Sequence, residues 1–143
     1  MRSTRVRFVD TNILLYAVSD VPDEARKRSV ADALLDERDL GLSVQVLQEF
    51  YVQATRTTRK NPLTHEQAAR LVAAFGRFAV QATTVELVEA AMASRERFGL
   101  SYWDAAIIEA ARALGCSEVL SEDLSAGQDY GGVVVTNPFR TGG

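Results

Sequence analysis

The pattern of apolar and polar positions predicts a regular order of strands and helices. The run from Val6 to Val9 is rich in β-branched and aromatic residues, and we expect a first strand there that presents Asp10 at its carboxyl end. Further strands are predicted over 40–42, 76–81, 118–121 and 133–135, and helical spacing predicts helices over 20–38, 44–55, 64–75, 83–98 and 101–114. This order predicts an α/β fold in which helices pack on both faces of a mainly parallel sheet.

Capping residues indicate where several of these helices begin and end. Ser43 is a suitable N-cap for the second helix, and Thr64 with Gln67 has the spacing of a capping box. Thr83 with Glu86 repeats that spacing, and Gly115 stands in the C-terminal capping position of the last helix. These positions divide the chain into elements without a linker between them.

Length and composition predict one globular domain over residues 1–143. The chain is 47% hydrophobic and 24% charged, and no apolar run approaches the roughly 18 residues that a membrane span needs. Its N-terminus does not resemble an export signal. The single cysteine, Cys116, excludes an internal disulfide and favours the reducing cytoplasm.

The charge pattern limits how the chain can contact nucleic acid. A net charge of −3 argues against binding by bulk electrostatics, so any such contact depends on local cations. Basic residues cluster at Arg2, Arg5 and Arg7, at 26–28 and at 56–60. For each cluster taken alone, a solvated surface is the simpler interpretation.

Elimination leaves carboxylates as the candidate chemistry. His65 is the only histidine and lies inside the predicted capping box, which favours a surface helix start over a catalytic triad. One histidine and one cysteine cannot form a structural zinc site, and Cys116 after a helix end is expected to be a packing residue. The sequence has no glycine-rich phosphate loop.

Four acids have positions that allow either a structural or a functional interpretation. Asp104 shares a helix face with Ile107 and Ile108, yet it is also placed to form a capping box with Ser101. Glu49 lies beside the apolar stripe of its helix, where it is either an ordinary flanking residue or a functional one. Asp10 and Asp123 each follow a strand, where an aspartate also suits a turn.

As a set, these acids predict a metal site. Asp10 and Asp123 at strand ends, together with Glu49 and Asp104 on helices, can meet at one edge of a parallel sheet. Clustered carboxylates repel one another unless a cation lies among them or some are protonated. Ligation by oxygen alone suits Mg²⁺ or Mn²⁺, and such an ion can activate water and neutralise charge on a phosphodiester.

The sequence resembles the PIN-domain ribonucleases, and within them the VapC-type toxins of toxin–antitoxin pairs. The similar segments are 8–12, 46–51, 100–105 and 120–124, with a related tail over 129–139. The resemblance implies a single PIN-like domain in which Asp10, Glu49, Asp104 and Asp123 fill an acidic metal-binding quartet. Asn12 and Ser121 match supporting polar positions that we assign to placing water or backbone.

The resemblance also implies an activity and partners. They are a Mg²⁺- or Mn²⁺-dependent endoribonuclease that leaves a 5′-phosphate and a 3′-hydroxyl, an RNA substrate, a cognate antitoxin and a homodimer in the cytoplasm. Glu122 and Asp129 remain alternatives for the fourth acidic position.

Three other protein classes are alternatives to the nuclease, and the sequence argues against two of them. An aspartate-dependent phosphatase needs a second acid where Asn12 stands, and a receiver domain needs a late lysine, whereas the only lysines are Lys27 and Lys60. A catalytically idle PIN-like scaffold that binds RNA or protein is the remaining alternative.

Overall fold

The computed structural model describes residues 6–140, which contain one five-stranded parallel sheet. The strands lie in the order β3-β2-β1-β4-β5, so β1 is central. Phe8 of β1 pairs with Gly41 on one side and Val119 on the other. The strands are β1 (Arg7–Val9), β2 (Leu40–Ser43), β3 (Ala79–Gln81), β4 (Glu118–Leu120) and β5 (Val134–Thr136). Arg2 and Arg5 of the first basic cluster lie outside the described residues.

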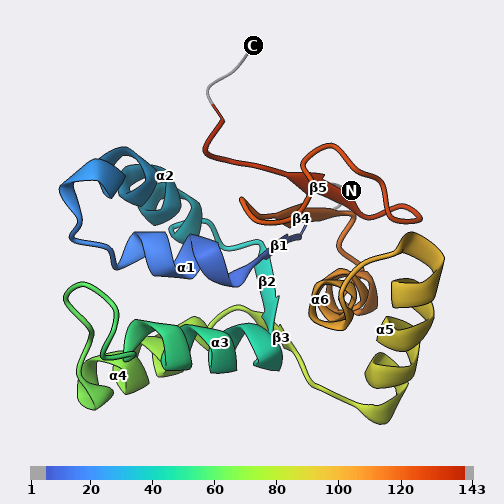
Figure 1. Cartoon of the computed structure of the whole chain (residues 1–143), viewed down its shortest axis with the longest axis horizontal. Helices are drawn as coiled ribbons and strands as arrows, with labels where there is room; N and C mark the ends of the chain where they lie inside the picture. The colour runs from blue at the N-terminus through green and yellow to red at the C-terminus, as the bar shows by residue number, and fades with distance from the viewer. Residues whose placement is uncertain (1–5, 141–143) are drawn as a thin grey trace.

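Helices cover both faces of this sheet, which confirms the predicted fold class. Figure 1 shows α1 to α4 on one side of the strands and α5 with α6 on the other. The helices are α1 (Thr11–Ala17), α2 (Ala25–Leu35), α3 (Val44–Ala54), α4 (His65–Phe75), α5 (Val85–Phe98) and α6 (Tyr102–Ala113), with a 3-10 turn at Pro22–Glu24. None of the helices within residues 6–140 has the length and apolar character that a membrane crossing requires.

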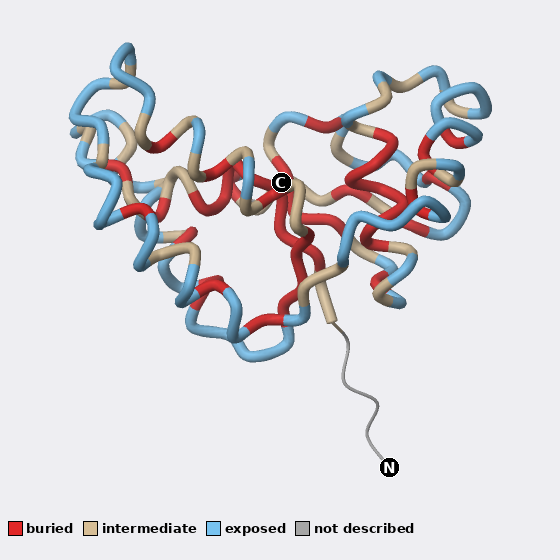
Figure 2. The backbone as a smooth tube through the Cα atoms, turned by 90° about the horizontal axis from the view of Figure 1, so that it is seen from below, coloured by how far each residue is buried: buried red, intermediate tan, exposed pale blue. Residues whose placement is uncertain are grey.

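The hydrophobic core lies where the strands meet the inner faces of the helices. Phe8, Leu42 and Val119 from adjacent strands are fully buried, as are Phe50 of α3 and Ile108 of α6. Figure 2 shows that buried backbone is concentrated in the central strands, while the outer turns of the helices are exposed. The core therefore holds the carboxyl ends of the central strands in fixed positions.

Two local predictions differ from the structure. The helix predicted over 20–38 begins with the 3-10 turn and ends at Leu35. The N-cap of α5 is Thr84 rather than Thr83, because the Thr84 side chain accepts the hydrogen bond from the Leu87 backbone N–H.

Candidate active site

Asp10 joins the end of the central strand to the start of α1. Its side chain caps α1 by accepting a 2.7 Å hydrogen bond from the Thr11 backbone N–H. The Ser121 hydroxyl donates to the other carboxylate oxygen at 2.8 Å. Ser121 follows β4, which pairs directly with β1, so two neighbouring strand ends hold this carboxylate. Asp10 is 8% exposed and lies at the carboxyl edge of the sheet, as predicted.

Asn12 connects the acids that follow β1 and β4. Its side-chain nitrogen donates to the Asp123 carboxylate and to the Ser121 hydroxyl, both at 3.2 Å. Its side-chain oxygen accepts from the Glu122 backbone N–H at 3.1 Å. An aspartate at position 12 would lack these donors, so an amide suits the position better than the acid that a phosphatase requires.

Glu49 reaches the same region from α3. One carboxylate oxygen accepts from the Gln45 side chain at 2.7 Å, and the other accepts from the Thr11 hydroxyl at 3.1 Å. Glu49 is therefore held by two side chains and is not a free flanking residue. The sequence interpretation overlooked both partners, although Gln45 lies one turn before Glu49 and Thr11 directly follows Asp10.

Asp104 lies in the first turn of α6, whose N-cap is Ser101. The Ser101 hydroxyl accepts from the Asp104 backbone N–H at 3.1 Å, but within residues 6–140 the Asp104 carboxylate makes no hydrogen bond that would close a capping box. Instead it lines a cavity of about 110 Å³ together with Asp10, Glu49 and Asp123. Four carboxylates from four separate segments thus face one small space.

The environment of this cavity disfavours the charged form of Asp10. Burial raises the pKa of Asp10 to about 6, against the opposing hydrogen bonds from Thr11 and Ser121. The negative charges of Glu49 and Asp123 raise the Asp10 pKa further. An ionised Asp10 is therefore costly in this environment unless a positive charge lies nearby.

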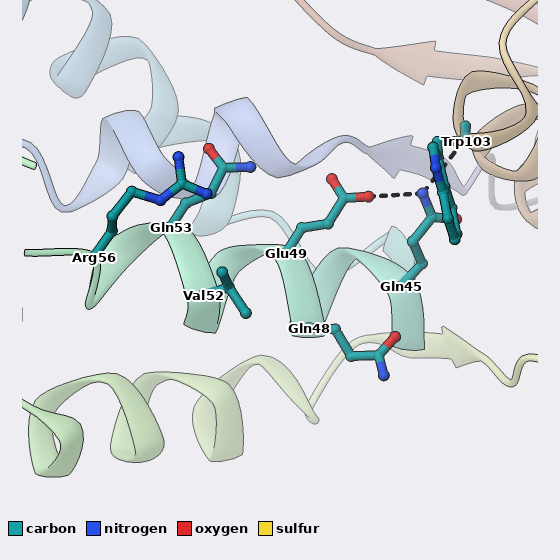
Figure 3. A pocket seen from close by; sticks show the side chains of 7 residues that line it. All are labelled: Gln45, Gln48, Glu49, Val52, Gln53, Arg56 and Trp103. Atoms are coloured by element: carbon teal, nitrogen blue, oxygen red, sulfur yellow. Dashed lines mark hydrogen bonds between the residues drawn. The ribbon is translucent and has the colours of Figure 1, made fainter. Parts of the chain in front are cut away.

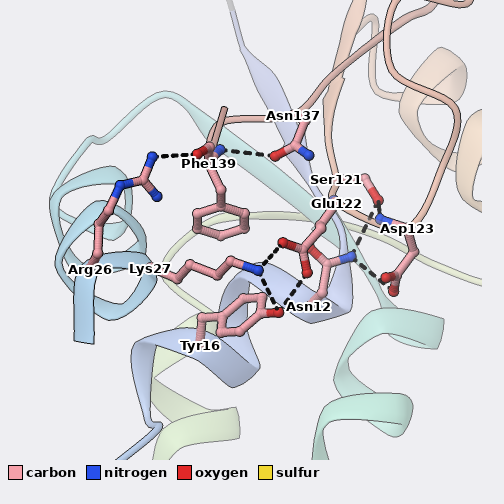
Figure 4. Close-up of polar contacts among 9 residues, drawn as sticks. All are labelled: Asn12, Tyr16, Arg26, Lys27, Ser121, Glu122, Asp123, Asn137 and Phe139. Carbon is pink, nitrogen blue, oxygen red and sulfur yellow. Dashed lines mark hydrogen bonds and ion pairs between the residues drawn. The ribbon is translucent and has the colours of Figure 1, made fainter. Parts of the chain in front are cut away.

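The alternatives for the fourth acid occupy different surroundings. Glu122 turns away to contact Lys27 and Tyr16, whereas Asp123 lies on the other side of Asn12 (Figure 4). Burial alone would raise the pKa of Glu122, but the hydrogen bonds from Lys27 and Tyr16 outweigh it and lower the pKa. Asp129 accepts from the Gly132 backbone N–H at 2.7 Å in a distant turn. Of these three acids, only Asp123 lines the cavity.

His65 and Cys116, which the sequence indicates are not catalytic, both have contacts that fit a structural role. His65 is exposed at the start of α4, and its Nδ1 atom lies 2.8 Å from the Tyr51 hydroxyl. Cys116 is buried in the core, and this burial raises the pKa of its thiol to about 11. A thiol with so high a pKa is a poor nucleophile at neutral pH, which agrees with a packing role.

The donor set of the cavity fits a hard divalent cation. All four side chains offer carboxylate oxygens, the ligands that Mg²⁺ and Mn²⁺ prefer, and the raised Asp10 pKa indicates a deficit of positive charge. Within residues 6–140, no group of three or more His, Cys, Asp or Glu side chains is close enough to form a ready-made metal site. The four carboxylates thus line one cavity but are too far apart to bind an ion as they stand. Ligation would require their side chains to move closer together.

Comparison with known proteins identifies the family. The family model described as "PIN domain" matches residues 7–126. The chain belongs to the PIN-domain family. This match covers β1 to β4 and all four acids, so the cavity lies within the PIN domain. A search of curated protein sequences finds no match.

Solved structures with this PIN domain's fold include toxin–antitoxin proteins. A chain of a toxin–antitoxin complex from Klebsiella pneumoniae has a TM-score of 0.67 at 21% identity, covering 92% of this chain and 97% of that chain. VapC20 from Mycobacterium tuberculosis, described as a sarcin-ricin loop cleaving toxin, has a TM-score of 0.63 at 21% identity, with coverage of 82% and 89%. A chain of DNA-bound VapBC from Salmonella typhimurium has a TM-score of 0.65 at 18% identity, covering 94% of this chain and 98% of that chain. At these identities the likeness is one of fold.

Proposed function

We propose that this PIN domain is a metal-dependent endoribonuclease and the toxin of a toxin–antitoxin pair. The observation that carries the proposal is the convergence of Asp10, Glu49, Asp104 and Asp123 on one cavity at the carboxyl edge of the sheet. Four acids facing one small space are costly without a cation, which makes a purely structural role a poor explanation.

The chain's own residues have distinct roles in this proposal. The four carboxylates hold Mg²⁺ or Mn²⁺, which, when bound, activates water and neutralises charge on the phosphodiester. Asn12 and Ser121 are positioning residues, because their hydrogen bonds fix the carboxylates of Asp10 and Asp123. Gln45 and Thr11 orient Glu49 in the same way.

The proposed partners come from the fold relatives. The printed descriptions of three of them name a toxin–antitoxin complex, a toxin that cleaves the sarcin-ricin loop, and VapBC bound to DNA. By analogy we assign this chain an RNA substrate and a cognate antitoxin, and the resemblance of the sequence adds a homodimeric state and a cytoplasmic location.

RNA cleavage by the purified protein, free of antitoxin, tests the activity. We expect cleavage of total RNA with Mn²⁺ or Mg²⁺, none with EDTA, and a loss of at least about 100-fold in Asp10→Asn, which removes one metal-binding charge. Asp129→Asn is the matched control, because Asp129 lies outside the cavity, and it should retain activity.

Equal cleavage by wild type and Asp10→Asn would contradict the proposed site. A wild type that neither cleaves RNA nor binds metal would favour the idle scaffold instead.

A further inference from the structure

A second hollow adjoins the acidic cavity. This groove, of about 480 Å³, runs along α3 to the start of α6 and is lined by Gln45, Gln48, Val52, Gln53, Arg56 and Trp103, together with Glu49. Gln45, Glu49, Gln53 and Trp103 line both the groove and the acidic cavity. The two spaces are therefore continuous, and a chain molecule with one bond in the cavity would extend into the groove.

Trp103 forms one end of the groove and is the only exposed residue among the Phe, Tyr and Trp residues within 6–140. Its side chain is 65% exposed, although it directly precedes Asp104 of the cavity. Tyr102 packs edge-on against the indole at 5.0 Å, and the Gln45 side chain donates to the Trp103 backbone oxygen at 3.3 Å. These contacts fix the position of an indole that remains open to solvent.

The floor of the groove is a row of polar side chains on α3. Gln45, Glu49 and Gln53 are each four residues apart, and Arg56 follows directly after the helix C-cap (Figure 3). The row spans roughly 16 Å from Gln45 to Arg56 at 1.5 Å per residue. The Glu49 carboxylate thus lies between the amides of Gln45 and Gln53, each of which can both donate and accept hydrogen bonds.

Arg56 places a positive charge in the groove beside the acidic cavity. Its guanidinium makes no ion pair within residues 6–140, and neither do the neighbouring Arg59 and Lys60. Arg56 stands at the far end of the groove from Trp103. In a chain with a net charge of −3, this local group is suited to hold an anionic backbone.

We propose that the groove binds the single-stranded RNA that flanks the scissile phosphate. One base stacks on Trp103, Arg56 contacts a backbone phosphate, and the amides of Gln48 and Gln53 contact base edges. An exposed aromatic and an unpaired cation along one groove are the combination that single-stranded nucleic acid requires, since bases stack and phosphates need charge. The inference rests on the proposed function, because it places the scissile phosphate in the acidic cavity.

Fluorescence gives a direct readout of this stacking. Trp103 is the only tryptophan in the chain, so its emission reports on this one position. We would titrate the protein in EDTA at low salt with a random-sequence, single-stranded 12-nucleotide RNA. Binding should quench the emission, and anisotropy of the same RNA carrying an end label gives the affinity independently. A duplex RNA of equal length should quench much less.

Variants separate the groove from other surfaces. Trp103→Ala should weaken RNA binding roughly 5- to 100-fold, and Trp103→Phe should restore part of the affinity because it keeps an aromatic face. Arg56→Gln should weaken binding and reduce the salt dependence by about one counterion. Met92→Ala and Arg70→Gln, both at exposed positions outside the groove, are the matched controls and should bind as wild type does.

Saturable RNA binding without a change in Trp103 emission would overturn the inference, as would equal affinities for Trp103→Ala and Met92→Ala. An absence of RNA binding would overturn it too. If Trp103→Ala instead changes the oligomeric mass by light scattering and leaves RNA affinity unchanged, the groove is a protein interface. Cleavage with Mn²⁺, run in parallel, keeps the proposals separate: cleavage that ignores Trp103 refutes only the groove, and RNA binding at Trp103 without cleavage refutes only the nuclease.

Discussion

At the scale of single residues, Asp10 is a buried acid whose pKa is raised to about 6. It is buried next to Ser121 and Thr11, and the charges of Glu49 and Asp123 add to the effect of burial. Asn12 limits the repulsion by placing an amide between Asp10 and Asp123, since its nitrogen lies 3.5 Å from one carboxylate and 3.2 Å from the other. The site is therefore held in place by neutral groups and remains short of positive charge.

This cost predicts how the metal-free protein responds to pH. Because the pKa of Asp10 is raised from 3.8 to about 6 on folding, the folded state binds a proton more tightly than the unfolded chain does. The stabilisation that the Asp10 proton gives to the folded state is greatest below about pH 4 and is lost as the pH rises through 6. The free energy of unfolding in EDTA, relative to Asp10→Asn, should fall by about 2–3 kcal/mol between pH 4 and pH 7.

Urea unfolding of the two proteins across this range measures the difference, and other titrating groups cancel in it. If the difference in unfolding free energy between the two proteins is constant or increases with pH, folding does not raise the pKa of Asp10.

At the scale of elements, the sequence predicted most of the fold because the signals were local. Ser43, Thr64 and Ser101 each act as the N-cap predicted for their helices, and five short apolar runs became strands. The prediction failed where a local signal had two solutions. Thr83 and Thr84 are both acceptable caps, and only the bond to Leu87 selects Thr84.

The convergence of the four acids on one cavity was predictable from the sequence, and their hydrogen-bond partners were less so. Strand ends and a helix face indicated Asp10, Asp123 and Asp104, since these patterns depend on nearby residues. The bond from Thr11 to Glu49 joins residues 38 positions apart, and the contact of Lys27 with Glu122 spans 95. Such pairs follow from how helices pack on the sheet, which a single sequence does not state.

Gly41 shows how closely two elements approach each other. A Cβ atom at Gly41 would lie 2.8 Å from Leu114 Cδ1 and 3.4 Å from Val6 Cγ1, so β2 meets the end of α6 without room for a side chain. Gly41→Val should reduce the free energy of unfolding by roughly 1–3 kcal/mol through overpacking. In the double variant with Leu114→Ala, the loss should be smaller than the sum of the single losses by about 1 kcal/mol.

Chemical denaturation of the four proteins completes this cycle. Additive losses would mean that Leu114 is not what limits the space at Gly41.

At the scale of the whole molecule, the parallel sheet brings distant acids together. Asp10 and Ser121 directly follow the neighbouring strands β1 and β4, and α3 and α6 add Glu49 and Asp104 from the two layers of helices. The chain has a net charge of −3, so under the proposed function the acidic cavity would need a bound cation, and the groove beside it would need Arg56, to receive an anionic substrate.

Mn²⁺ binding by isothermal titration calorimetry at pH 7.5 tests this account most directly, because Asp10 is ionised above its pKa of about 6. Asp104→Asn is the informative variant, since within residues 6–140 its carboxylate makes no hydrogen bond that the substitution would break. We predict saturable Mn²⁺ binding by wild type and by Asp129→Asn, and at least about tenfold weaker binding by Asp104→Asn. No binding by wild type, or equal binding by all three proteins, would contradict a metal site in this cavity.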